Sequence, residues 1–115
     1  MSGSYSFSDE TLKKDIVRIE SSDALDKVSQ LSAVTYKWLE KDDDETHIGL
    51  IAQEVQEIVP EVVEERERLQ PNSDALLEDQ PNKLYVEYDR LVPLLVESIK
   101  ELTNRVSELE SKLAE

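Results

Sequence analysis

The feature that most constrains this chain is a regular repeat of apolar residues along its last quarter. Spacings of three and four residues alternate along this seam, which consists of Val92, Leu95, Ile99, Leu102, Val106, Leu109 and Leu113. A sustained heptad repeat predicts a long helix that pairs with other helices as a coiled coil. Asp89 is expected to be its N-cap, and Pro93 lies in the first turn, where a missing N–H costs little.

The seam leaves the partner of this helix open. It is only two residues wide per heptad, whereas a helix that packs on its own globular core usually shows a broader apolar stripe. Pairing between chains is therefore favoured over folding back on the sheet. Val or Ile at the first seam position and Leu at the second favour a parallel dimer by themselves, but a globular part can override that preference. The seam predicts an oligomer without fixing the number of chains.

Composition excludes several classes of function. The 115 residues suffice for one modest domain, and the formal net charge of −14 repels nucleic-acid phosphate and anionic lipid. The chain has no cysteine, and His47 is its single histidine, so no disulfide, thiolate zinc site or histidine cluster can form. No apolar run approaches ~18 residues, so no transmembrane span is expected. We predict no metal, no cofactor, no nucleic-acid partner and no membrane partner.

Short, changing patterns before the seam predict a small α+β domain over residues 8–90. Residues 1–7 are expected to be a tail or upstream remnant, and residues 91–115 the coiled-coil helix. In chain order we first expect a helix start capped by Ser8, strand-like residues 16–19 and a short helix capped by Ser22. A hairpin of strands 34–38 and 47–51 follows, and then a helix that begins at Ala52 and is stopped by Pro60. The last expected elements are a short strand at 62–63 and a strand at 83–88.

The remaining expectations concern a loop and the aromatic residues. Residues 64–82 contain Pro, Asn and many charges, and predict an exposed loop with a helical turn at 75–77. Tyr36, Trp38, Tyr85 and Tyr88 are expected in the core or at an interface.

Four separated motifs carry a resemblance to a known family. They are Ser-Asp-Glu-Thr-Leu-Lys-Lys-Asp-Ile at 8–16, Val-Thr-Tyr-Lys-Trp at 34–38, His-Ile-Gly-Leu-Ile-Ala-Gln-Glu-Val at 47–55, and Val-Glu-Tyr-Asp-Arg-Leu-Val-Pro-Leu-Leu at 86–95. Together they resemble the C-terminal intramolecular chaperone domain of phage tailspikes, tail fibres and neck appendages, the endosialidase chaperone or S74 peptidase family. The resemblance runs from Ser8 to the end of the chain.

The resemblance implies a homotrimer that acts on its own polypeptide. Such domains follow elongated trimeric stalks, bring three chains into register, and then release themselves by cutting beside a serine. A serine–lysine pair does this in the family, and it corresponds here to Ser8 and Lys13, with the cut at a peptide bond adjacent to Ser8. The partners implied are the other two chains and the upstream stalk. The setting implied is the host cytoplasm during virion assembly, with the domain absent from the mature particle.

The chemistry of that pair sets a geometric condition. A serine hydroxyl is a poor nucleophile until a base takes its proton, and a lysine can do so only in its neutral form, which a desolvated pocket favours. Residues five apart on a continuous helix lie about 140° apart around its axis. Ser8 must therefore lie outside the helix, or Lys13 must come from a neighbouring chain. His47 and Asp9 are further candidate participants, although each also has an ordinary structural role.

Two other functions remain open. One is a structural trimerisation cap that never cuts. The other is a self-cleaving domain that releases a membrane-bound transcription factor, because a related domain of the myelin regulatory type does so. An enzyme that acts on an external substrate is disfavoured, since no phosphate-binding loop, metal cluster or paired glycosidase carboxylates stand out.

Overall fold

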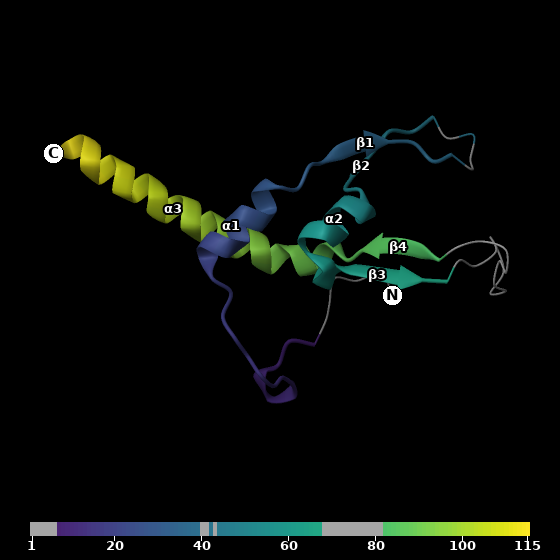
Figure 1. Ribbon diagram of the computed structural model, residues 1–115, viewed down its shortest axis with the longest axis horizontal. Coiled ribbons are helices and arrows are strands. Elements are labelled where there is room, and N and C mark those ends of the chain that lie inside the picture. Colours follow the sequence, from purple (N-terminus) through teal and green to yellow (C-terminus); the bar gives the residue numbers. More distant parts are fainter. Residues whose placement is uncertain (1–6, 40–41, 43, 68–81) are drawn as a thin grey trace.

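In the computed structural model, a small globular body carries a long helix at one end and an extended N-terminal arm at its side (Figure 1). The structure describes residues 7–39, 42, 44–67 and 82–115. Its principal extents are 65 × 41 × 25 Å and its radius of gyration is 19.0 Å, against about 13 Å for a compact domain of this length. The elongation comes from the helix and the arm, and it leaves much apolar surface without a partner in one chain.

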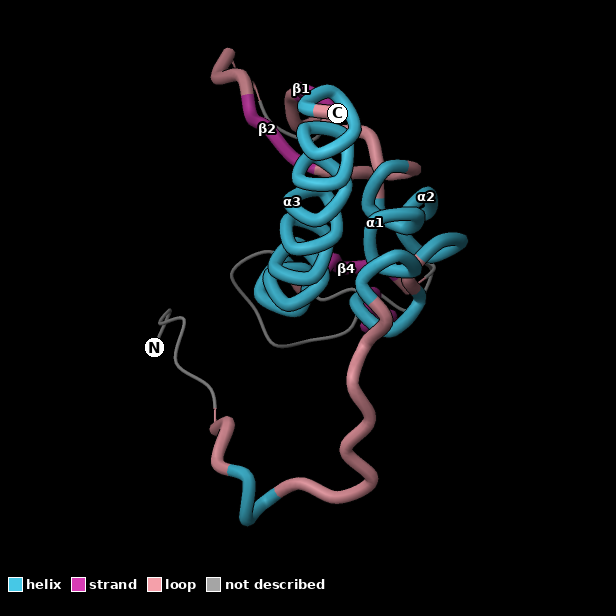
Figure 2. Tube along the Cα trace, turned by 90° about the vertical axis from the view of Figure 1, so that its left-hand side faces the viewer, coloured by secondary structure: helices cyan, strands magenta, loops and turns pink. Residues whose placement is uncertain are grey.

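The body is organised by two helices that lie side by side (Figures 1 and 2). Helix α1 (Ser21–Ser29) packs against the first turns of α3 (Val92–Ala114). Ala24 of α1 is completely buried, and Leu94 and Ser98 are the buried residues of α3. The Ser98 hydroxyl donates to the Leu94 carbonyl at 2.7 Å, so this buried polar group is satisfied.

Helix α2 (Ala52–Ile58) and a second hairpin complete the core. Strands β3 (Val63–Arg66) and β4 (Lys83–Val86) pair antiparallel, with Val63 opposite Val86. Among the described residues the buried apolar side chains are Ala24, Val55, Val59, Val62, Leu91 and Leu94. The core is therefore small and aliphatic. Trp38, Tyr85 and Tyr88 are about half exposed and do not belong to this core, so of the two expected places only an interface stays a prediction for them.

The first hairpin, β1 (Val34–Tyr36) with β2 (His47–Gly49), is held to the body by Tyr88. Its register pairs Val34 with Gly49 and Tyr36 with His47. The Tyr88 hydroxyl accepts a hydrogen bond from the Leu50 N–H at 2.9 Å. Gly49 makes this approach possible, because a Cβ there would lie 2.8 Å from the Tyr88 hydroxyl oxygen.

Three predicted N-caps were wrong. Asp9, not Ser8, caps the first turn, which is a 3-10 turn at Glu10–Leu12. Helix α1 begins at Ser21 after Glu20, so Ser22 is not its cap. Before α3 the chain forms a 3-10 turn at Tyr88–Leu91, and Leu91 precedes the helix in place of Asp89. Propensity finds a helix start only approximately, because tertiary contacts compete for the same hydroxyls and carboxylates.

Other local predictions were closer. Pro60 does end α2, since Val59 is its C-cap, and Pro93 lies in the first turn of α3. Residues 16–19 are extended but belong to no strand. Strand β3 occupies part of the predicted loop at 64–82, whereas the turn predicted at 75–77 lies outside the described residues.

The seam remains exposed along the whole of α3. Its seven side chains are between 44% and 86% exposed, and the buried Leu94 and Ser98 lie on a different face of the helix. The helix thus does pack on its own chain, on α1 and not on a sheet, and pairing between chains stays a prediction. The first turns pack on α1 of the same chain, and the seam is left over for another partner.

We expect Gly49→Ala to lower the free energy of unfolding by about 1–2 kcal/mol, because overpacking forces the Tyr88 ring to move or its hydrogen bond to break. Tyr88→Phe removes the hydroxyl that the methyl group added by Gly49→Ala would meet, so it should relieve the overpacking. Urea unfolding of both single variants and the double variant measures the coupling. Fully additive losses would show that Gly49 does not serve to admit Tyr88.

Candidate active site

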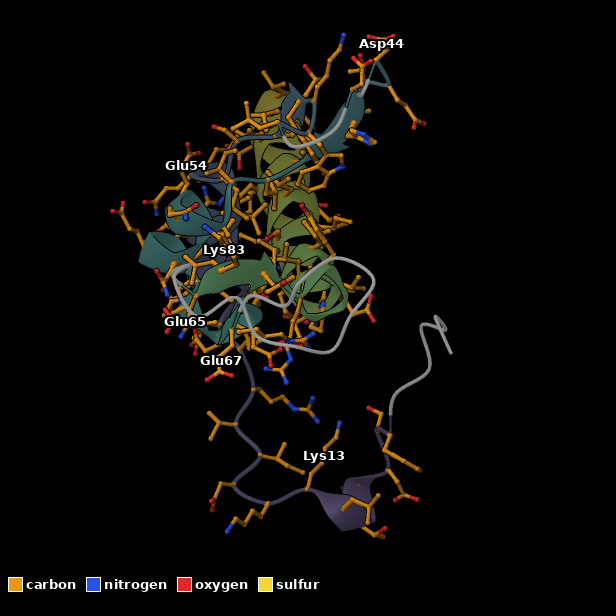
Figure 3. All side chains as sticks on the ribbon, turned by 90° about the vertical axis from the view of Figure 1, so that its right-hand side faces the viewer. Lys13, Asp44, Glu54, Glu65, Glu67 and Lys83 are labelled. Carbon is orange, nitrogen blue, oxygen red and sulfur yellow. The ribbon has the colours of Figure 1, made fainter. Side chains whose placement is uncertain are left out.

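The candidate site lies on the N-terminal arm, residues 7–20, which leaves the start of α1 and extends away from the body (Figures 2 and 3). Every described residue of the arm is exposed. Its apolar side chains include Leu12, Ile16 and Val17, which are 70%, 61% and 84% exposed. The arm therefore presents its residues to water, or to another polypeptide that covers them.

Ser8 and Lys13 meet on this arm. The Lys13 Nζ donates to the Ser8 Oγ at 2.8 Å. The 3-10 turn at Glu10–Leu12 makes this contact possible, because it is a single tight turn and Ser8 lies before its N-cap. The structure thus meets the geometric condition set by the sequence within one chain: the serine lies outside the helical turn.

Asp9 holds the turn in shape. One carboxylate oxygen of Asp9 accepts from the Thr11 N–H at 2.9 Å and from the Thr11 hydroxyl at 2.8 Å. These hydrogen bonds, first the one from the backbone, lower the pKa of Asp9 below its ordinary value of 3.8. Asp9 therefore acts here as the cap of the turn that lies between Ser8 and Lys13.

The chain changes direction immediately after the pair. Asp15 has a φ of 52°, a left-handed conformation that Asp tolerates better than most residues. This turn sends residues 16–20 in extended form toward the start of α1.

His47 is not brought to the pair within one chain. It lies on β2, where its ring centroid is 5.3 Å from that of Tyr36 and 5.9 Å from that of Trp38. The hairpin of β1 and β2 and the arm lie on opposite sides of the body (Figures 1 and 2).

Glu97 joins the base of the arm to α3, and sequence reasoning missed it. The Ser21 hydroxyl donates to a Glu97 carboxylate oxygen at 2.8 Å, and the Lys100 Nζ donates to the other at 3.3 Å. The Ser21 hydrogen bond is the largest influence that lowers the pKa of Glu97, and the charges of Lys100 and Arg18 act in the same direction. No local pattern could reveal a contact across 76 residues.

The described residues contain neither a metal-binding group nor a membrane-spanning helix. No three His, Cys, Asp or Glu side chains are grouped so that they could hold a metal ion. No helix there has both the length and the apolar character to cross a membrane.

Comparison with known proteins identifies similar sequences. Residues 8–64 match the model of a family described as chaperone of endosialidase, Peptidase S74. The long tail fiber protein Gp37 of Enterobacteria phage K3 is 38% identical over 112 residues, which cover 95% of this chain and 8% of the fibre protein. The protein of the same name from Enterobacteria phage T2 matches with the same values. The chain thus spans about 8% of the length of these relatives.

We expect the Thr11 amide to report the cap. In wild type its NMR shift should follow the ionisation of Asp9 with a midpoint below 3.8, because the folded pKa is lowered. The cap is then complete above the unfolded pKa and is lost as the pH falls through the folded one. Asp9→Asn should keep hydrogen exchange at the Thr11 amide slow, since Asn also caps well, whereas Asp9→Ala should make this exchange faster. A Thr11 shift that ignores pH between 2 and 5 would contradict this role.

Proposed function

The chain belongs to the S74 peptidase family of endosialidase chaperones, and from that premise we propose that it is the assembly domain of a phage fibre, which trimerises, helps the upstream stalk to fold, and then cuts itself free at Ser8. The observation that carries the proposal is the 2.8 Å contact between Ser8 Oγ and Lys13 Nζ. These residues stand at the beginning of the segment that matches the family, next to whatever precedes the domain.

The proposed reaction uses the pair as nucleophile and base. Neutral Lys13 takes the proton of the Ser8 hydroxyl while Ser8 Oγ attacks the carbonyl carbon of an adjacent peptide bond. The leaving amine receives that proton, an ester to Ser8 remains, and water hydrolyses the ester. Because the substrate is the same polypeptide, the reaction runs once and needs no binding pocket for an external molecule.

The exposed seam supports the assembly step. Its apolar side chains stand out from α3 in one chain, and pairing buries them against the repulsion between acidic copies. Three stalks tied at one end reach effective concentrations on the order of mM, which favours register between chains before slow, non-local strand contacts form. After release, the finished stalk lacks its nucleus for refolding and becomes kinetically hard to unfold.

The names of the relatives place the proposal in fibre assembly. Both are long tail fiber proteins of phages, so the upstream stalk proposed for this chain is a phage fibre. The domain then acts in the host cell during virion assembly and is absent from the mature particle.

A trimerisation cap that never cuts is the second candidate. The exposure of Ser8 and Lys13 favours it, because a lysine that donates to a serine on the surface is an ordinary hydrogen bond. The two candidates share the seam and differ only at the arm.

We expect a longer chain that carries its natural upstream stalk to split beside Ser8, as measured by intact mass, and Ser8→Ala to stay whole. Lys13→Arg is the matched control for the base, because it keeps a cationic donor beside Ser8 but cannot become neutral. It should trimerise and not cut. A Lys13→Arg chain that cuts at the wild-type rate would remove Lys13 from the chemistry, and a wild type that stays whole as a stable trimer would leave the non-cleaving cap.

Mixed trimers test whether the pair acts within one chain. Co-expressed Ser8→Ala and Lys13→Ala chains each lack half of the pair. Since Ser8 and Lys13 meet within one chain, we expect no product from the mixture. Product would show that a serine of one chain is served by the lysine of another.

The seam is tested by placing one carboxylate at a seam position and, as a control, one at a position outside the seam. Ile99→Asp places a carboxylate in the seam and should abolish the oligomer in sedimentation at micromolar concentration, because a buried unpaired charge costs several kcal/mol. Asn104→Asp adds the same charge outside the seam and should leave the oligomer intact. Equal effects of the two variants would contradict pairing through the seam.

A further inference from the structure

A groove of about 600 Å³ separates the arm from the first turns of α3. Its apolar lining includes Val17 of the arm and Val92 and Val96 of α3. These three side chains are 84%, 54% and 49% exposed, so one chain leaves them largely in contact with water. Val92 also belongs to the seam, so the groove directly borders the surface proposed for assembly.

The charged lining of the groove is unlike the rest of the chain. Lys13, Arg18 and Lys100 line it with a single carboxylate, Glu97, although acidic residues outnumber basic ones 27 to 13 overall. That carboxylate already accepts from Ser21 and Lys100. The groove thus combines apolar side chains with an excess of positive charge, which suits an acidic partner surface.

The order of surfaces around α3 indicates which acidic surface would meet the groove. At 100° per residue, Val96 and Lys100 lie about 40° and 80° from Val92 on one side of the seam. Ser98 and Leu94, which contact α1, lie about 120° and 160° from Val92 on the other side. The seam therefore runs between the groove and α1.

A closed ring of three parallel helices brings those two sides together. Its interfaces are heterologous, so one flank of each seam meets the opposite flank of the next. With the seam residues at positions a and d of the heptad, position e of one helix faces position g of the next helix. The groove of one chain must then face α1 of the next. The exposed carboxylates of α1 are Asp23 and Asp26, opposite in charge to the groove.

We propose that in the trimer α1 of each chain covers the arm groove of its neighbour, with Asp23 and Asp26 toward Arg18 and Lys100. This inference rests on the proposed trimer and adds a second interface beside the seam. It also gives self-cleavage its dependence on assembly. Covering the groove removes water from Lys13 beside Ser8, and a desolvated amine is the form that can take the serine proton.

Zero-length carboxyl–amine cross-linking of trimers mixed from ¹⁴N and ¹⁵N chains tests the contact. We expect peptides of mixed isotope in which Lys100 of one chain is joined to Asp23 or Asp26 of another. Trimers that yield only cross-links within one chain at these residues overturn the groove contact and leave the seam. A wild-type chain that stays monomeric at every concentration overturns the proposed assembly as well.

Charge reversal gives a second, independent measurement. Arg18→Glu should weaken the trimer about tenfold or more in sedimentation equilibrium and slow self-cleavage in the longer chain, because it places like charges opposite each other. Lys14→Glu makes the same change on the same arm outside the groove, and should alter either quantity less than twofold. Adding Asp26→Lys to Arg18→Glu should restore most of the loss. Equal weakening by both arm variants, or no rescue, overturns the proposal.

Discussion

The packing of α1 on the first turns of α3 is the contact on which the rest of the structure depends. Ser98 is small and returns its hydroxyl to the Leu94 carbonyl, so α1 can approach without leaving a polar atom unsatisfied. This contact buries the face of α3 that carries Leu94 and Ser98, and it leaves the seam exposed to solvent. It also places Ser21 next to Glu97, which fixes where the arm begins. The packing of α1 on α3 thereby sets the position of the proposed assembly surface and of the start of the arm that carries the candidate active site.

The sequence predicted best what is encoded over neighbouring residues. The heptad period gave the long helix, alternation gave the hairpin of β1 and β2, and Pro60 ended α2 because its ring cannot continue a helix. The predicted caps failed for local reasons: Asp9 caps the first turn in place of its neighbour Ser8, and a further 3-10 turn precedes Val92. At the site, the pair Ser8 and Lys13 was identified by resemblance. That the two side chains meet follows from a tight 3-10 turn, which residue spacing on an α-helix does not predict.

Electrostatics and apolar surface oppose each other throughout this chain. A formal charge of −14 keeps single copies apart, while the exposed seam and arm offer apolar area that only association can bury. A surface that is locally basic is valuable in such a chain, because it lets one acidic copy attract another at a defined place. The groove beside the seam has this character, and in the proposed trimer its position on α3 would set the rotation of each copy about its helix.

The proposed self-cleavage would ask less of a protein than turnover does. Proximity is supplied by the chain itself, since the bond to be cut is attached to the nucleophile, and such intramolecular arrangement can replace much of what a binding pocket provides. The variable that remains is the direction of one hydrogen bond. In the structure Lys13 donates to Ser8 Oγ at 2.8 Å, whereas in the proposed reaction Lys13 accepts the serine proton. The proposed cover over the groove would remove water from this pair, so in that proposal the exposed pair of one chain waits for assembly.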